Sequence, residues 1–341
     1  DFCLSRGLGD VYKRQYYNSV GYTNQDGVMK GTNYQRYTLQ SKQDFKKGIF
    51  QAGTNVVLTY DQSNPLYSVI RGGMVGHTLQ AIPTWEQYDE NRTGGYGGLY
   101  GDVVNLTHPL GMVDDNLMKR YSDNVKIFAN AYVSVELMKG LKYKLNLTPD
   151  FQFYRYNSYE GLFDFGLAKH DITAVTEQQT RTRNILVENL LTFDRTFGDH
   201  KVSALVGYTY QDSRYRYMQG SGQGMPTGIT EIDAASQGLA VSGNSSRSVL
   251  TSILGRAFYS YKNRYLLTAT IRRDGSSKFG SNYRYGNFPS VSVGWNIAEE
   301  DFVKNSVSWL DQLKLRGGYG VLGNQAVSYT HLRAHETGRN L

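Results

Sequence analysis

The feature that most constrains this chain is a strict alternation of apolar and polar side chains over long stretches. In KIFANAYVSVEL, residues 126–137, every second residue from Ile127 to Leu137 is apolar, and polar residues dominate the positions between them. A period of two places alternate side chains on opposite faces of a β-strand. After a short turn, LKYKLNLTPDFQFYRY at 141–156 repeats the pattern. The two stretches therefore predict a β-hairpin with one apolar and one polar face.

Further stretches of this kind can be placed along the chain, and all of them are long. Eleven strands are expected, at residues 16–23, 34–45, 49–60, 126–137, 141–156, 184–197, 201–212, 247–261, 265–273, 288–297 and 312–321. Strands of globular proteins usually have about five or six residues. A soluble β-sandwich would also alternate apolar and polar residues, so strand length and the pattern of connections must separate it from a membrane barrel.

The connections alternate between short and extended. Short ones are expected at 46–48, 138–140, 198–200 and 262–264, and extended ones at 24–33, 61–125, 157–183, 213–246 and 274–287. The turn at 298–311 is longer than the other short ones and is expected to contain a short helix around 299–303. Bacterial outer-membrane barrels have short periplasmic turns and long outer loops. Because no apolar run approaches the length of a membrane-spanning helix, the predicted fold class is all-β, an antiparallel transmembrane β-barrel.

Aromatic residues are frequent near the ends of the expected strands. The chain has 28 tyrosines, and those near strand ends include Tyr208, Tyr210, Tyr259, Tyr261 and Tyr265, together with Trp295. In a membrane barrel such rings lie at the lipid–water interface. The intrinsic β-propensity of tyrosine and tryptophan explains the same positions. The sequence leaves both explanations open.

The two ends of the chain differ from the rest. CLSRGLGDVYKRQ at 3–15 and VSYTHLRAHET at 327–337 resemble translated adapter sequence, so residues 1–15 and 327–341 are excluded from fold reasoning. Residues 16–326 are then expected to be part of the membrane barrel. The exclusion removes Cys3, the only cysteine, and lowers the formal net charge from +7 to +5. The remaining positive charge is spread along the chain, which disfavours a nucleic-acid partner.

No motif in the chain predicts chemistry. GYGVLG at Gly318–Gly323 fits the dinucleotide pattern G-x-G-x-x-G, but that site needs a helix to follow at once, and none is expected there. The histidines outside the excluded end are isolated, which disfavours a zinc site. Neighbouring carboxylates such as Asp114 and Asp115 are more simply solvated loop charges. We therefore expect no catalytic residue, no cofactor and no metal.

Three segments carry a resemblance to a known family. They are SILGRAFYSYKNRYLLTATIRRDGSSKFG at 252–280, YRYGNFPSVSVGWNIAEEDF at 283–302 and LDQLKLRGGYGVLGNQ at 310–325. They look like the barrel of the SusC/RagA family of TonB-linked outer-membrane transporters. The upstream YYNSVGYTNQDGVMKGTNYQRYTL at 16–39 is similar to the early barrel strands of that family. The resemblance covers most of residues 16–325.

The resemblance implies a larger machine than eleven strands can form. Family members have a barrel of about 22 strands with a plugged lumen, so the expected strands are about half of one, and no plug, TonB-contacting segment or closing strand is recognisable. The implied location is the Gram-negative outer membrane. The implied partners are a SusD-like surface lipoprotein, the TonB–ExbB–ExbD complex acting through the plug, outer-membrane lipid and an oligosaccharide ligand. A peptide or siderophore receptor and a surface glycan-binding β-protein remain alternatives.

Ligand binding is expected in the outer loops, because functional residues concentrate in loops on rigid scaffolds. Sugar recognition favours aromatic faces for stacking and planar polar groups for hydroxyls. The loop at 61–125 offers Trp85, Tyr88, Arg92, Tyr96 and Tyr100, the entry to the loop at 157–183 offers Tyr154 and Tyr156, and the loop at 213–246 begins with Arg214 and Tyr215. These nine residues are the predicted ligand-binding set.

Overall fold

Almost all of the structure is one antiparallel sheet. The computed structural model describes residues 2–4, 14–65, 73–99, 106–305 and 309–323. The strands of the main sheet lie side by side in chain order: β1 (Phe2–Leu4), β2 (Arg14–Asp26), β3 (Asn33–Lys47), β4 (Phe50–Asn64), β5 (Met118–Met138), β6 (Leu141–Glu160), β9 (Ala174–Phe197), β10 (His200–Gln223), β11 (Gln237–Tyr261), β12 (Tyr265–Ser276), β13 (Tyr285–Asn296) and β14 (Lys314–Gly320). A separate two-stranded ribbon joins β7 (Phe163–Asp164) to β8 (Lys169–His170).

The eleven predicted strands are confirmed as β2–β6 and β9–β14, with all pairings antiparallel. Within the segment excluded on sequence grounds, residues 2–4 form β1 and pair with residues 18–20 of β2. Residues 327–341, the other excluded segment, lie outside the described residues.

The predicted outer limits of several strands are wrong. The first residue of β5 is Met118 instead of Lys126, and that of β9 is Ala174 instead of Asn184. The last residue of β10 is Gln223, and the first of β11 is Gln237, so the expected loop at 213–246 is mostly strand. The apolar alternation stops where these strands leave the apolar band, but the backbone ladder continues beyond that point.

In the part of the chain that the structure describes, helices are few and short. They are α1 (Gly73–Gln80), α2 (Asp301–Lys304) and the 3₁₀ turns η1 (Gly111–Val113), η2 (Ile232–Ala234), η3 (Ser281–Tyr283) and η4 (Ile297–Glu299). The short helix expected around 299–303 is confirmed by η4 and α2. Within the described ranges, none of the helices is long and apolar enough to cross a membrane.

The tight turns at one end of the sheet have the local chemistry of short hairpins, with two residues between β3 and β4 and between β9 and β10, and three between β11 and β12. Lys262 and Asn263, between β11 and β12, adopt φ values of 52° and 56°, as a type I′ turn requires. Gly48 and Gly198 supply positive φ in the turns between β3 and β4 and between β9 and β10. Such turns fix the register of the long strands that follow.

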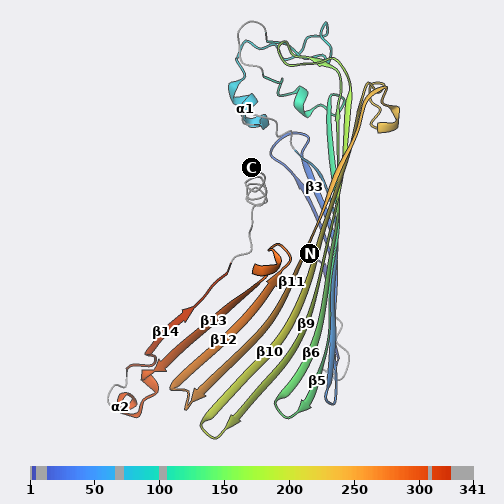
Figure 1. Cartoon of the computed structure of the whole chain (residues 1–341). Coiled ribbons are helices and arrows are strands. Elements are labelled where there is room, and N and C mark those ends of the chain that lie inside the picture. Colours follow the sequence, from blue (N-terminus) through green and yellow to red (C-terminus); the bar gives the residue numbers. More distant parts are fainter. Residues whose placement is uncertain (1, 5–13, 66–72, 100–105, 306–308, 324–341) are drawn as a thin grey trace, which may run out of the picture.

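The sheet is curved, and its two faces differ in character. Figure 1 shows the irregular segments around α1 on the concave side at one end of the sheet and the short turns at the opposite end. Met118 packs in a cluster with those irregular segments, which lie on the concave side. Asn130 follows Met118 in β5 by an even number of residues, so it points to the same face. The polar face of the sheet is therefore the concave one. On the convex face, Val206, Ile253 and Ile271 are 57–59% exposed. This uncovered apolar surface is typical of a wall that faces lipid.

Aromatic rings gather on the convex face. Tyr22, Tyr37 and Tyr60 lie directly opposite one another on β2, β3 and β4, with ring centroids 5.0 Å and 6.4 Å apart. Near the tight turns, Tyr261 stacks on Tyr265 at 6.4 Å, and Trp295 lies opposite Tyr265. The alternation places all six aromatic residues singled out from the sequence on this face. Because β-propensity alone does not select a face, this placement favours the interfacial explanation.

Candidate ligand-binding site on the concave face

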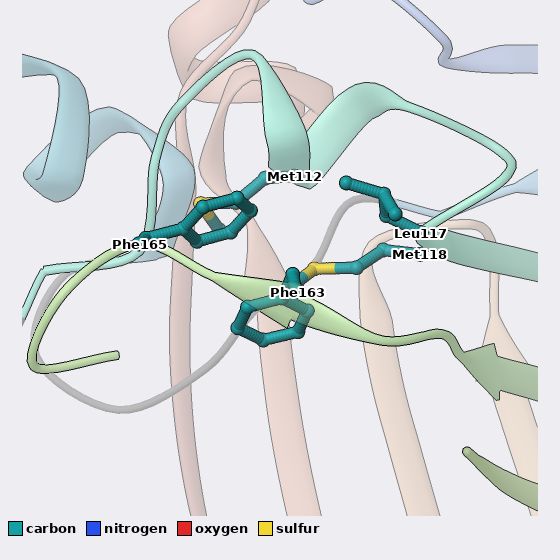
Figure 2. Close-up of a cluster of buried hydrophobic side chains, with 5 residues drawn as sticks. All are labelled: Met112, Leu117, Met118, Phe163 and Phe165. Carbon is teal, nitrogen blue, oxygen red and sulfur yellow. The ribbon is translucent and has the colours of Figure 1, made fainter. Parts of the chain in front are cut away.

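The concave face is covered at its outer end by a cap, which we define as residues 73–99, 106–117 and 161–173. Figure 2 shows the hydrophobic cluster at its centre, formed by Met112, Leu117, Met118, Phe163 and Phe165. These side chains are only 0–8% exposed. Because Met118 is the first residue of β5, the same cluster packs the cap against the sheet.

Three of the predicted ligand-binding aromatics lie within the cap, and two of them are hydrogen-bonded inside it. The indole Nε1 of Trp85 donates to the carbonyl oxygen of Gly97 at 3.0 Å, and the hydroxyl of Tyr96 donates to Oδ2 of Asp114 at 2.9 Å. Both rings contact His108, with centroid distances of 4.8 Å and 5.2 Å. Burial and the bond to Asp114 raise the pKa of Tyr96 to about 12. Burial lowers the pKa of His108, which favours a neutral imidazole beside these rings.

Arg92 is also part of the internal structure of the cap. Its side chain is 8% exposed, with Nε 3.2 Å from Asp89 and Nη1 3.1 Å from Asp164. The contact with Asp164 joins two cap segments that are far apart in sequence. A guanidinium held in this way gives little surface to a ligand, although the planar polar chemistry predicted from the sequence is present.

Tyr88 is the predicted cap residue that remains accessible. Its side chain is 64% exposed, and its ring lies 5.6 Å from that of Tyr96. Tyr100 lies outside the described residues. Of the described aromatic candidates in the cap, Tyr88 therefore has the most exposed side chain for stacking on a ligand.

The strands beneath the cap bring three other predicted residues together on the concave face. Tyr154 lies opposite Thr180 of β9, which lies opposite Tyr217 of β10. The adjacent rows run from Tyr156 through Gln178 to Gln219 and from Gln152 through Thr182 to Tyr215. Residues directly opposite in an antiparallel ladder point to the same face. We call Tyr154, Tyr156, Tyr215 and Tyr217, with Gln152, Gln178 and Gln219, the tyrosine wall.

The tyrosine wall offers stacking surfaces and amide groups without formal charge. Gln178 Nε2 donates to Gln219 Oε1 at 3.2 Å, and the hydroxyl of Tyr217 donates to the same oxygen. These bonds orient the amides beside the rings. Among the described residues, no three His, Cys, Asp or Glu side chains form a group that could hold a metal ion. The arrangement is therefore suited to binding neutral polar molecules.

The cap begins next to the tyrosine wall, on the side away from the tight turns. Met118 in the cap cluster pairs with Glu160, and Ser122, four residues further along β5, pairs with Tyr156. At about 3.3 Å per residue this offset is about 13 Å. Glu160 also contacts Arg120 of β5 at 3.5 Å and His170 of the cap at 3.7 Å. The cap and the tyrosine wall are thus neighbouring parts of one concave surface.

The structure does not bring Arg214 to this surface. Arg214 shares the convex face with Val206 and Asp212 of β10, and its Nη2 lies 3.4 Å from Oδ2 of Asp212. Extending the alternation of β10 past Asp212 would have separated Arg214 from its neighbour Tyr215. The same alternation places Tyr217, the second residue after Tyr215, on the concave face with it.

Comparisons with known proteins agree with this architecture. No family model matches the chain. It is 29% identical over 324 residues to the TonB-dependent receptor P39 of Formosa agariphila and 30% identical over 333 residues to the receptor P3 of the same organism, matches that cover 94% and 92% of this chain. It is 27% identical over 340 residues to the TonB-dependent receptor SusC of Bacteroides thetaiotaomicron, again over 92% of the chain. The resemblance to the SusC/RagA family is confirmed.

These curated relatives are much longer than the region that this chain matches. The chain spans between 30% and 32% of the length of these curated relatives. Among solved structures, the chain matches the RagAB peptide transporter with a TM-score of 0.78 and 20% identity, over 92% of this chain and 36% of that one. At this identity the match supports the fold, a section of an antiparallel receptor barrel.

Proposed function

We propose that this SusC/RagA-type chain forms part of the wall of a TonB-dependent importer in the Gram-negative outer membrane. The observation that carries the proposal is the curved sheet, with an uncovered apolar convex face and a polar concave face. A soluble glycan-binding protein would have to cover the convex residues, because exposed apolar patches of this extent are uncommon in water. In lipid the same residues need no cover, and the closed backbone ladder of a complete barrel satisfies their polar groups.

We further propose that the ligand is an oligosaccharide bound on the tyrosine wall and by Tyr88. Aromatic rings with hydroxyls and amides, and no formal charge in the rows of Tyr154 and Tyr156, suit a neutral polyhydroxylated molecule. A peptide is the second candidate, because the matched RagAB structure is described as a peptide transporter. Glutamine amides such as those of Gln178 and Gln219 could bind peptide groups equally well.

The partners follow from the proposed machine. A SusD-like surface lipoprotein would lie over the cap, which covers the outer end of the concave face (Figure 1). The TonB–ExbB–ExbD complex would supply the energy for passage. The residues of this chain contribute capture and orientation of the ligand rather than a chemical step.

Titration of the complete receptor with its lipoprotein separates the two ligand classes. The probes are a mixture of neutral oligosaccharides and a mixture of neutral peptides, with binding measured calorimetrically. Replacing Tyr154 with alanine should weaken oligosaccharide binding about tenfold, as loss of a stacking contact of about 1–1.5 kcal/mol implies. Phe153→Ala, on the convex face of the same strand, is the matched control and should leave binding unchanged. Equal effects of the two variants would contradict a site on the tyrosine wall, and binding of peptides alone would replace the oligosaccharide by the second candidate.

A further inference from the structure

A dense group of arginines lies on the convex face, outside the candidate ligand site. Across β9, β10 and β11, Arg183, Arg214 and Arg247 form one row of directly opposed residues. In the next row, on the side away from the tight turns, Arg181 lies opposite Arg216. We call these five arginines the arginine grid, together with Asp212, which lies in the neighbouring row toward the tight turns.

Asp212 compensates only part of this charge. Its carboxylate is 8% exposed and receives Arg247 at 3.0 Å, Arg183 at 3.3 Å and Arg214 at 3.4 Å. Within the described residues, no ion pair joins Arg181 or Arg216 to a carboxylate. Like charges placed directly opposite in an antiparallel pair destabilise it. The arginine grid therefore has a strong excess of positive charge, and an anion from outside the chain would relieve it.

The position of the grid indicates where that anion comes from. The row directly inward of Asp212 consists of Val187, Tyr210 and Thr251, and rows that include Ile253 and Val206 follow. Five arginines thus begin where the apolar band of the convex face ends. In a membrane this level is the boundary between hydrocarbon and headgroups. Arg214, Arg216 and Arg247 also line one open hollow of the surface with Met218 and Val241, so cationic and apolar groups are adjacent there.

We propose that the arginine grid binds the phosphate groups of anionic lipid in the outer leaflet, with the adjoining apolar residues contacting the acyl chains. This inference rests on the proposed membrane location of the sheet. Guanidinium groups bind phosphate through paired N–H donors, and basic clusters at a membrane surface recognise anionic headgroups. Arg155 on the neighbouring β6 does not extend the grid, because its Nε lies 2.7 Å from Asp123.

The test removes the two arginines that do not contact Asp212. The complete receptor is purified in mild detergent as wild type and as the Arg181→Gln/Arg216→Gln double variant. Native mass spectrometry then measures retention of two probes, phosphorylated lipid A and the same lipid after phosphatase treatment. The matched control is Arg256→Gln, which removes one arginine from the concave face of β11, where Arg256 donates to Thr270 at 3.3 Å.

Binding of phosphorylated lipid should fall about tenfold in the double variant, as expected for loss of charge-assisted hydrogen bonds, and should be unchanged in Arg256→Gln. Dephosphorylated lipid should be retained weakly and equally by all three proteins. The inference is overturned if the double variant keeps phosphorylated lipid as well as the wild type does, or if phosphate removal has no effect on retention.

A different measurement, the fractionation of the complete receptor, tests the proposed function itself. If the complete wild-type receptor does not fractionate with the outer membrane, the membrane location itself is wrong. If it does, and lipid retention ignores the arginines, only the lipid site is wrong.

Discussion

The sheet and the cap are stabilised in different ways, although the chain passes directly from one into the other. In the sheet, β9 and β10 pair along 24 residues each, while large apolar side chains such as Val206 stay exposed on the convex face. In the cap, regular structure is sparse, and Phe165 is fully buried. The sheet is held by its backbone ladder and leaves its apolar convex face uncovered, as the proposed contact with lipid allows, whereas the cap buries its apolar side chains in a small core of its own.

This difference predicts unequal local stability. The cap core of five buried side chains is small, and small cores open locally at lower free energy than long ladders. The contacts of Tyr96 with Asp114 and of Arg92 with Asp164 add specific links between cap segments. Changes to these side chains should loosen the cap without unfolding the sheet.

The largest effect is expected from truncating the centre of the cap core. Phe165→Ala should destabilise the cap by about 3–5 kcal/mol, because it leaves a cavity among Phe163, Met112 and their neighbours. Even a loss of about 3 kcal/mol should accelerate hydrogen exchange of residues 106–117 and 161–173 by more than about 100-fold. The control Phe153→Ala removes an aromatic ring from the exposed convex face and should leave cap exchange unchanged. An equal acceleration throughout β9 and β10 would show that sheet and cap form one cooperative unit.

A smaller effect is expected from the turns of the sheet, where two glycines differ in their surroundings. Gly140 and Gly198 both have positive φ, at 86° and 58°. A Cβ on Gly140 would lie 2.4 Å from the carbonyl oxygen of Asp194, whereas a Cβ on Gly198 would meet no atom within 4 Å. Gly198→Ala should cost about 1–2 kcal/mol from backbone strain alone, and Gly140→Ala should cost more.

Urea unfolding of the complete receptor in detergent measures the cost of each glycine substitution. Cap exchange should not respond to either change. Equal costs for the two variants would show that the turn at Gly140 moves away from Asp194 at little expense.

The strands of the sheet could be predicted from sequence because their signal is local. A period of two in stretches such as 126–137 identified all eleven strands, and the resemblance gave their common architecture. Their outer limits could not be predicted in the same way. In residues 213–223 of β10, both faces carry polar or mixed side chains, so strand pairing continues with no apolar alternation to reveal it.

The predicted ligand-binding residues also differ in how far the sequence could place them. Tyr154, Tyr156 and Tyr215 lie on strands, and the alternation of odd and even residues places them on one face. Parity could also have separated Arg214 from Tyr215. Trp85 and Tyr96 belong to the cap, where the chemistry of a side chain does not reveal its partner. Their bonds to Gly97 and Asp114 arise only from tertiary packing.

The smallest expected effect distinguishes sheet and cap by pH. Burial among Trp85, Tyr96 and Phe165 lowers the pKa of His108 below its ordinary value of 6.5. The opened cap then binds a proton more readily than the closed one, so cap stability rises with pH in this range. The contribution of neutral His108 to cap stability is fully present above pH 6.5, and it is lost as the pH drops from 6.5 toward the native pKa of His108.

Hydrogen exchange of residues 106–117, corrected for intrinsic rates, should therefore be a few-fold faster at pH 5.5 than at pH 7.5, with no matching change in β9 and β10. His77 and His170 also lie in the cap, so the control is His108→Gln, which keeps both and removes only the buried imidazole. In that variant the acid response should be lost. If it persists unchanged, the proton binds elsewhere in the cap, and the buried ring stack does not make the cap more acid-sensitive than the sheet.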